Sequence, residues 1–400
     1  MRSLRSPFFC RSRAIAALMT VAAVTLLALV WRPMNLLLDR ITLPSGAMPK
    51  LDGPYLPGHM SDSVSVHGRP LAVDIWYPRD RPPRGEAMQA PGASSRVAGD
   101  VPAASAILEH FGLVENAPPA AAPAQFPMLI FVPGWNGGRR SNTVLNATLA
   151  AAGYVVVAID DVGGEASPTG DAAHNFDFST DAGFANSWQV AERRLAMMTE
   201  RVSGVIGGVL DRSGGGADWP FAGRLDPEAL GVLGFSFGGS VAAAAPRNDR
   251  RIRAAANLDG WLMGAACAQG IAAPYLSFSS EFPGLEGATR SWSTGRRLMA
   301  KATVIDRRCQ RELSRAPDTF ALIIKGTQHS DFTDGLFAPA LRNYVRPPWG
   351  LWREGQLKVH EITVSMLLSF FDSHLRHRGT PPLLSERPGP HREVVWIGPE

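Results

Sequence analysis

The sequence has few cysteines and lacks the common motifs of metal and dinucleotide sites. Its 400 residues include only three cysteines, too few for a disulfide framework or for a zinc site built from cysteine pairs. Neither the His-Glu-x-x-His pattern nor the glycine fingerprint of dinucleotide-binding folds occurs. We therefore expect no metal ion and no organic cofactor. Cys267 and Cys309 would either pair in an oxidising compartment or remain as buried free thiols.

The sequence also lacks a basic patch and an internal repeat. The formal net charge is +4, but residues 1–35 hold five arginines and no acidic residue, which leaves −1 on the remainder. A nucleic-acid-binding surface would need a cluster of positive charge, so we expect no nucleic-acid partner. Hydrophobic residues make up 45% of the chain, enough for one large core. We infer no oligomeric state.

The chain opens with an arginine-rich stretch and a long apolar run. Residues 14–31 are 18 residues broken only by Thr20 and Thr25, and as a helix they would span about 27 Å, close to the bilayer core. The nearest small-x-small cleavage pattern, at residues 45–47, lies well beyond the run. We favour an uncleaved signal anchor within residues 1–35 over a cleaved signal peptide. The positive-inside rule then places the remainder outside the cytoplasm, either membrane-anchored or, after cleavage, secreted or periplasmic.

The remainder alternates between strand-like and helix-like segments, which predicts an α/β fold with a mostly parallel central sheet flanked by helices. A pair of strands is expected within residues 50–78. Further strands are expected over residues 128–132, 154–159, 230–235, 254–258, 274–281 and 320–324, and helices over residues 141–152, 186–210 and 360–375.

Three segments stand apart from this alternation within or after a catalytic domain expected over residues 50–378. Residues 80–126 are rich in proline and alanine and are interpreted as an insertion over the core. Residues 282–317 form a long link with a short helical run, and are a candidate lid. Residues 379–400 are expected to be a loosely ordered tail.

A Gly-x-Ser-x-Gly pattern joins a strand-like segment to a helix-like one. It reads Gly-Phe-Ser-Phe-Gly-Gly at residues 234–239, after the apolar run 230–233 and before the small-residue run 240–245. In a sharp strand-to-helix turn the serine hydroxyl is exposed, and the glycines are needed because a Cβ would collide with neighbouring backbone. This context favours Ser236 as a nucleophile over a tight turn that merely contains serine.

A serine nucleophile in this setting is followed along the chain by an acid and then by a histidine. Of the nine histidines, His329 stands on the loop after the apolar run 320–324, from which it can reach across the strand ends to the serine. We predict it as the general base. The others precede the serine, begin a helix or lie in a basic or proline-rich tail: His59, His67, His110, His174, His360, His374, His377 and His391.

Two residues compete for the role of the acid. Asp259 ends the strand that follows the serine helix, in the segment Leu-Asp-Gly-Trp, and Glu281 ends the next strand. The short side chain, the following glycine and the apolar strand end favour Asp259, although it could instead be an Asx-turn residue. Asp160 and Asp331 remain as further alternatives.

With these residues in place, the chain resembles the platelet-activating-factor acetylhydrolase-like branch of the α/β-hydrolases, the type II or lipoprotein-associated phospholipase A2 kind. The resemblance rests on residues 234–239, on Leu-Asp-Gly-Trp at 258–261, and on Gly-Thr-Gln-His-Ser-Asp-Phe at 326–332. It covers about residues 50–375. It implies an α/β-hydrolase fold, a serine esterase and, because that branch takes its acid from the strand after the serine helix, Asp259.

The oxyanion loop departs from the family pattern, with Pro133-Gly134 where a His-Gly pair is usual. By position, the two oxyanion donors would be the backbone N–H groups of Trp135 and Phe237. The glycine-rich loop lacks the lysine and hydroxyl of a phosphate-binding loop. Trp261 and Phe332, beside the expected acid and base, are candidates for an apolar substrate pocket, or else are core residues.

Three functions follow from this reading. The first is a serine carboxylic-ester hydrolase of the acetylhydrolase type, acting on short-acyl lipid or phospholipid-type esters. The second is a polyester, cutinase-like or general esterase on the same fold. The third is a non-catalytic, membrane-tethered binding protein, which would have no need of Ser236, Asp259 and His329 in this order.

The apolar N-terminal run predicts that the native protein stays in the membrane pellet. Burial of apolar residues is insensitive to ionic strength, whereas peripheral electrostatic binding is screened by salt. We expect the protein to remain in the pellet after high-salt and carbonate washes. Immunoblotting of the pellet and the supernatant measures this. A soluble protein whose mature N-terminus lies near Met48 would show that the segment is a cleaved leader.

Overall fold

The computed structural model describes residues 48–81, 111, 113–161, 176–215, 218–337, 353–379, 381–385 and 389–398. The anchor expected within residues 1–35 and most of the insertion expected over residues 80–126 lie outside these ranges. Within them, no helix combines the length and the apolar character needed to cross a bilayer.

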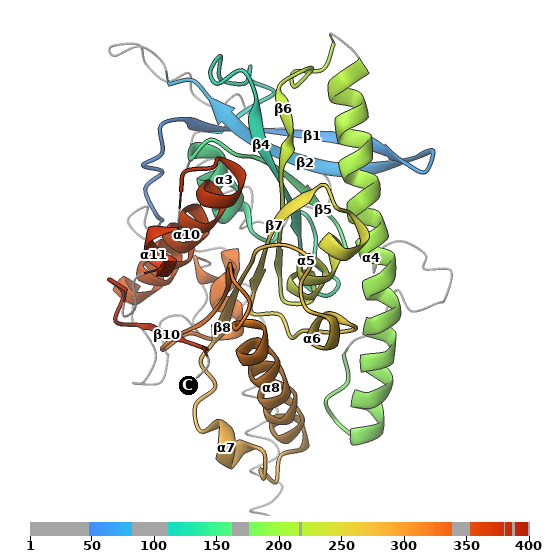
Figure 1. Ribbon diagram of the computed structural model, residues 1–400, viewed down its shortest axis with the longest axis vertical. Helices are drawn as coiled ribbons and strands as arrows, with labels where there is room; N and C mark the ends of the chain where they lie inside the picture. Colours follow the sequence, from blue (N-terminus) through green and yellow to red (C-terminus); the bar gives the residue numbers. More distant parts are fainter. Residues whose placement is uncertain are drawn as a thin grey trace, which may run out of the picture.

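A ten-stranded sheet runs through the molecule in the order β10-β9-β8-β7-β6-β4-β5-β2-β1-β3 (Figure 1). Its parallel part consists of β4 (Phe126–Val132), β5 (Val155–Ile159), β6 (Leu225–Phe235), β7 (Ile252–Leu258), β8 (Tyr275–Ser280) and β9 (Thr319–Ile324). The hairpin of β1 (Leu56–Val66) and β2 (Arg69–Arg79) joins it antiparallel to β5. The mostly parallel sheet expected from the sequence is confirmed.

Helices cover both faces of the sheet. In Figure 1, α4 (Asp181–Gly215) runs along one side beside α5 (Phe237–Asn248), whereas α3 (Thr143–Ala151) and α10 (Arg353–Leu375) lie on the other. Every residue of β4 is buried, so this strand reads as a continuous apolar run. Alternate β4 side chains enter two cores: Ile130 joins the core of α4 and α5, and Phe131 joins that of α3 and α10.

The helix α4 is longer than the expected segment 186–210. At its start, Thr180 Oγ1 accepts the N–H of Gly183 at 2.9 Å and caps the first turn. Near its other end it packs so closely on β1 that a Cβ on Gly208 would lie 2.4 Å from the carbonyl oxygen of Ser65. Packing against β1 therefore outweighs the low helix propensity of glycine.

The C-terminal tail is more ordered than we expected. The tail expected to be loose from residue 379 contains α11 (Pro382–Ser385) and β10 (Val394–Trp396), and β10 pairs antiparallel with β9. This pairing supplies hydrogen-bond partners to the edge of the sheet that would otherwise be open. From the insertion, β3 (Val114–Glu115) pairs with β1.

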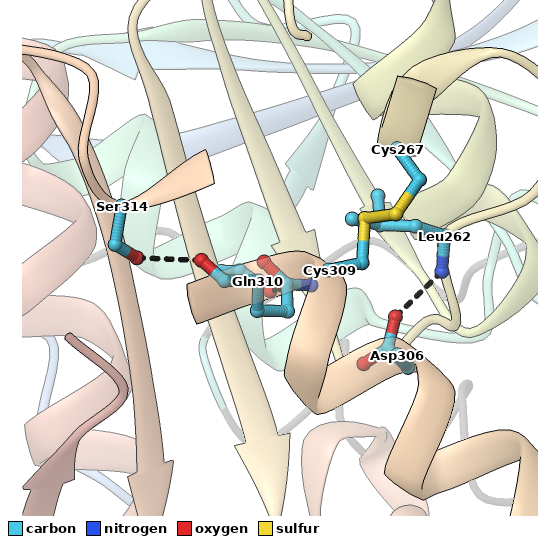
Figure 2. The surroundings of a disulfide bond; sticks show 7 residues. Leu262, Cys267, Asp306, Cys309, Gln310 and Ser314 are labelled. Atoms are coloured by element: carbon cyan, nitrogen blue, oxygen red, sulfur yellow. Dashed lines mark hydrogen bonds between the residues drawn. A yellow bond between two sulfur atoms is a disulfide. The ribbon is translucent and has the colours of Figure 1, made fainter. Parts of the chain in front are cut away.

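The candidate lid over residues 282–317 holds α7 (Leu285–Ala288) and a 20-residue helix, α8 (Thr294–Leu313). A disulfide joins Cys309 of α8 to Cys267 of α6 (Ala266–Gln269), as Figure 2 shows. In the same view, the carboxylate of Asp306 accepts the N–H of Leu262 at 2.8 Å. The C-terminal half of α8 is therefore fastened to the segment that follows β7.

Replacing Cys267 and Cys309 together by serine should destabilise the fold. The cross-link joins residues 42 apart, and its loss frees the unfolded chain, which should lower the free energy of unfolding by about 2–5 kcal/mol. Urea denaturation without reductant measures this difference. Cys10→Ser serves as the control for loss of a cysteine, and equal stability of the two variants would contradict the prediction.

Candidate active site

Ser236 lies in a strained turn between β6 and α5. Its φ is 54°, a value that favours glycine, and its N–H donates to the carbonyl of Leu258 at 2.8 Å. A Cβ on Gly234 would lie 1.9 Å from the carbonyl oxygen of Gly238, and one on Gly238 would lie 2.1 Å from that of Val132. Because strand and helix cross at backbone contact, only glycine fits at either position.

Three side chains predicted from the sequence form one hydrogen-bonded chain. His329 begins the short helix η4 (His329–Phe332) after β9, and its Nε2 lies 2.9 Å from Ser236 Oγ. Its Nδ1 lies 2.7 Å from Oδ2 of Asp259. The histidine side chain is 54% exposed and the aspartate 12%, so the serine end of the chain is open while the carboxylate end is sheltered.

The position of Asp259 is set by hydrogen bonds at the ends of β7 and β8. Its other carboxylate oxygen accepts the N–H of Ser280 at 2.6 Å, and its own N–H donates to Phe278 at 2.8 Å. The residue has a φ of 56°, and the next N–H, from Gly260, is held by the Asn257 side chain at 2.8 Å. These bonds hold the carboxylate in contact with His329.

The other candidate acids have different partners. Glu281 accepts the backbone N–H of Gly326 at 2.6 Å, which steadies the loop between β9 and His329. Asp160 accepts the N–H of Arg139 at 2.8 Å. Asp331 accepts the N–H of Gln328 at 2.9 Å within its own turn. Of the four, Asp259 is the residue whose carboxylate meets the imidazole of His329.

The histidine loop is also tied to the start of α3. Asp334 of η5 (Asp334–Leu336) accepts the N–H groups of Thr143 and Val144 at 2.6 and 3.0 Å, and so caps that helix from a distant part of the chain. Burial raises the pKa of Asp334 to about 7, against the lowering effect of these bonds. Asn142 donates to the carbonyl of Phe332 at 2.6 Å. Sequence reasoning missed these contacts, because each joins residues about 190 apart.

A cavity of about 680 Å³ opens beside Ser236. Aromatic rings and methionines make up much of its wall, and several of the rings contact one another: Trp135 and Phe237 meet edge to face with centroids 5.0 Å apart. Its apolar lining is Trp135, Phe176, Phe178, Phe237, Trp261, Met263, Phe282, Pro283 and Met299. The lining also includes polar groups from the α7 and α8 region, among them Arg296, Thr303 and Asp306.

Of the two predicted pocket residues, only Trp261 lines this cavity. Phe332 does not line it, contrary to the prediction. Its side chain is 5% exposed and packs in the core against Phe278, with ring centroids 6.4 Å apart. The bond from Asn142 to its carbonyl ties this turn to the start of α3, and the ring joins the core between the sheet and α10 instead of the cavity wall.

Asp306 is a cavity residue that sequence reasoning missed. It is buried on α8, and burial raises its pKa to about 7; the Leu262 N–H opposes this shift and the neighbouring charge of Asp259 adds to it. No sequence motif indicates that Asp306 is buried beside the cavity, because this position results from the packing of α8 against the segment after β7. Within the described ranges, no group of three or more His, Cys, Asp or Glu residues is arranged to hold a metal ion.

No protein-family model matches the chain, and no curated protein matches it in sequence. Among solved structures, the chain is similar to a ferulic acid esterase from Streptomyces cinnamoneus, with a TM-score of 0.55 and 23% sequence identity. The match covers 86% of this chain and 97% of the esterase. What the two share is the fold. The acetylhydrolase-like branch therefore stays a prediction.

Proposed function

We propose that this protein is a serine carboxylic-ester hydrolase. The observation that carries the proposal is the hydrogen-bonded chain from Ser236 through His329 to Asp259, open to a cavity at its serine end. A structural role does not require a strained, half-buried serine that is hydrogen-bonded to a histidine whose second nitrogen meets a carboxylate. A non-catalytic binding protein would have no use for this geometry.

The mechanism follows from these positions. His329 takes the proton of Ser236 as the serine oxygen attacks the ester carbonyl, and then gives it to the departing alcohol. Asp259 orients the imidazole and stabilises its cation. A water molecule, deprotonated in turn by His329, cleaves the acyl-enzyme and frees the acid. The backbone N–H groups of Trp135 and Phe237 would bind the negative charge on the carbonyl oxygen, and Phe237 stands at the N-terminus of α5, where N–H groups are unpaired by the helix.

The cavity wall supports an ester with an apolar acyl group. The resemblance to the acetylhydrolase-like branch favours short-acyl lipid or phospholipid-type esters. The aromatic rings of Trp135, Phe178 and Trp261 also suit a planar aromatic acid, and one solved structure of similar fold is a ferulic acid esterase. Esters of aromatic acids are therefore a second candidate substrate class.

We also propose that the protein acts outside the cytoplasm, held by its N-terminal segment. The disulfide between Cys267 and Cys309 supports this location, because such bonds persist in oxidising compartments.

Ser236→Ala should abolish ester hydrolysis and leave the fold intact. Removal of a triad nucleophile costs about 10⁴- to 10⁶-fold in turnover. The substrates to test are p-nitrophenyl esters from acetate to palmitate, a phospholipid with a short second acyl chain, and the methyl ester of ferulic acid. Labelling by a fluorophosphonate probe should disappear in the variant, and labelling that survives would refute the assignment.

Asp259→Asn and Glu281→Gln separate the two candidate acids. Asp259→Asn should lose about 10³- to 10⁴-fold in turnover, because the imidazole is left in the wrong tautomer. Glu281→Gln keeps an acceptor for the N–H of Gly326, and should stay within about tenfold of wild type. Steady-state kinetics on one p-nitrophenyl ester measures the two losses in turnover. A larger loss in Glu281→Gln than in Asp259→Asn would show that Glu281 is the acid that orients the histidine.

A further inference from the structure

A buried ion pair lies behind the loop that follows β4. Arg194 of α4 and Asp161, which lies just after β5, have side chains that are 2% and 0% exposed. Nε of Arg194 lies 2.9 Å from Oδ1 of Asp161, and Nη2 lies 2.5 Å from Oδ2. This is the bidentate geometry in which the planar guanidinium matches a carboxylate.

Both members of the pair bind the loop. Oδ2 of Asp161 accepts the N–H of Asn136 at 2.7 Å, and Nη2 of Arg194 donates to the Asn136 side chain at 3.0 Å. Asn136 has a φ of 54°, so its backbone is held in a conformation that asparagine adopts only at a cost. The N–H of Asp161 adds a third link, to the carbonyl of Gly137 at 3.1 Å.

The guanidinium also stacks on the residue beside Asn136. Its central carbon lies 4.2 Å from the centre of the Trp135 ring and 5.9 Å from that of Phe237. Trp135 is therefore held by Arg194 on its face and by Phe237 at 5.0 Å, edge to face. These are the two residues whose backbone N–H groups the proposed mechanism uses.

Stability alone is a poor explanation for this pair. Burying two charges costs free energy, and apolar replacements of similar volume are often neutral or stabilising, so a buried ion pair is weak evidence of a stabilising role. What Arg194 and Asp161 add is geometric: three hydrogen bonds and one stacked ring converge on residues 135–137. A backbone N–H must be aimed at the developing oxyanion before the reaction, since reorientation during it would cost rate.

We propose that Arg194 and Asp161 are positioning residues that hold Trp135 and Asn136 so that the N–H of Trp135 points at the oxyanion. The inference rests on the proposed esterase function and extends it to residues that contact neither Ser236 nor the acyl group. It also accounts for the absence of the usual His-Gly pair, because Pro133-Gly134 followed by a clamped Asn136 fixes the loop by another route.

Arg194→Lys and Asp161→Asn test the proposal on two substrates that differ in one atom. A p-nitrophenyl ester and its thionoester, with the same acyl chain, are hydrolysed in parallel. The C–S⁻ group of the thionoester intermediate accepts hydrogen bonds weakly, so it gains little from aligned N–H donors. We expect kcat for the ester to fall toward the about 10²- to 10³-fold loss typical of a missing oxyanion donor, with KM within about threefold. The thionoester should lose far less, so the ester-to-thionoester ratio of kcat/KM should fall.

This ratio distinguishes a loss of loop positioning from a loss of folded enzyme, because misfolded enzyme contributes to neither rate. Arg376→Lys is the matched control: its guanidinium lies 4.1 Å from the centre of the Tyr154 ring and pairs with Asp372 at 2.8 Å, on the α10 side of the sheet. The control should keep the wild-type ratio. An unchanged ratio in Arg194→Lys and Asp161→Asn, whatever the loss of total activity, would overturn the inference alone. A wild-type chain that hydrolyses neither substrate would overturn the proposed function and the inference with it.

Discussion

The site depends on the backbone contact between α5 and the ends of β4 and β6. No Cβ fits at Gly234 or Gly238, where carbonyl oxygens would lie about 2 Å away. A helix this close to the sheet forces the residue between strand and helix into a positive φ, and Ser236 takes that position. The buried strands β4 and β6 hold this strained turn in place. The turn directs the serine hydroxyl outward.

The parallel sheet then brings the partners of Ser236 to the same edge. Strands β7, β8 and β9 follow β6 in the sheet and run in the same direction, so the residues after the carboxyl ends of β7 and β9 lie at the same edge of the sheet. Asp259 and His329 are those residues. The ends of β4 and β5 supply Asn136 and Asp161 by the same rule. The parallel arrangement of the strands thus brings together both the hydrogen-bonded residues Ser236, His329 and Asp259 and the ion pair that holds the loop after β4.

Part of the cavity wall comes from segments that are not strand ends. Phe176 and Phe178 precede α4, and Met299, Thr303 and Asp306 come from α8. The disulfide and the Asp306 bond to Leu262 fasten α8 where it forms this wall. The strand ends therefore hold Ser236, Asp259 and the loop to His329, whereas the connecting segments complete the cavity wall. A shared fold consequently says little about which ester the proposed enzyme would bind.

The sequence by itself determined the α/β alternation, the tight turn at Ser236 and the order serine, aspartate, histidine, because each depends on residue type and spacing within a few turns of chain. It also ranked Asp259 above Glu281. It did not determine the ordered tail, the place of Phe332, the link between Cys267 and Cys309, or the pairing of Arg194 with Asp161. Those depend on contacts between residues far apart in the chain. Only the tertiary structure decides them, since burial and the choice of partner arise when the helices pack on the sheet.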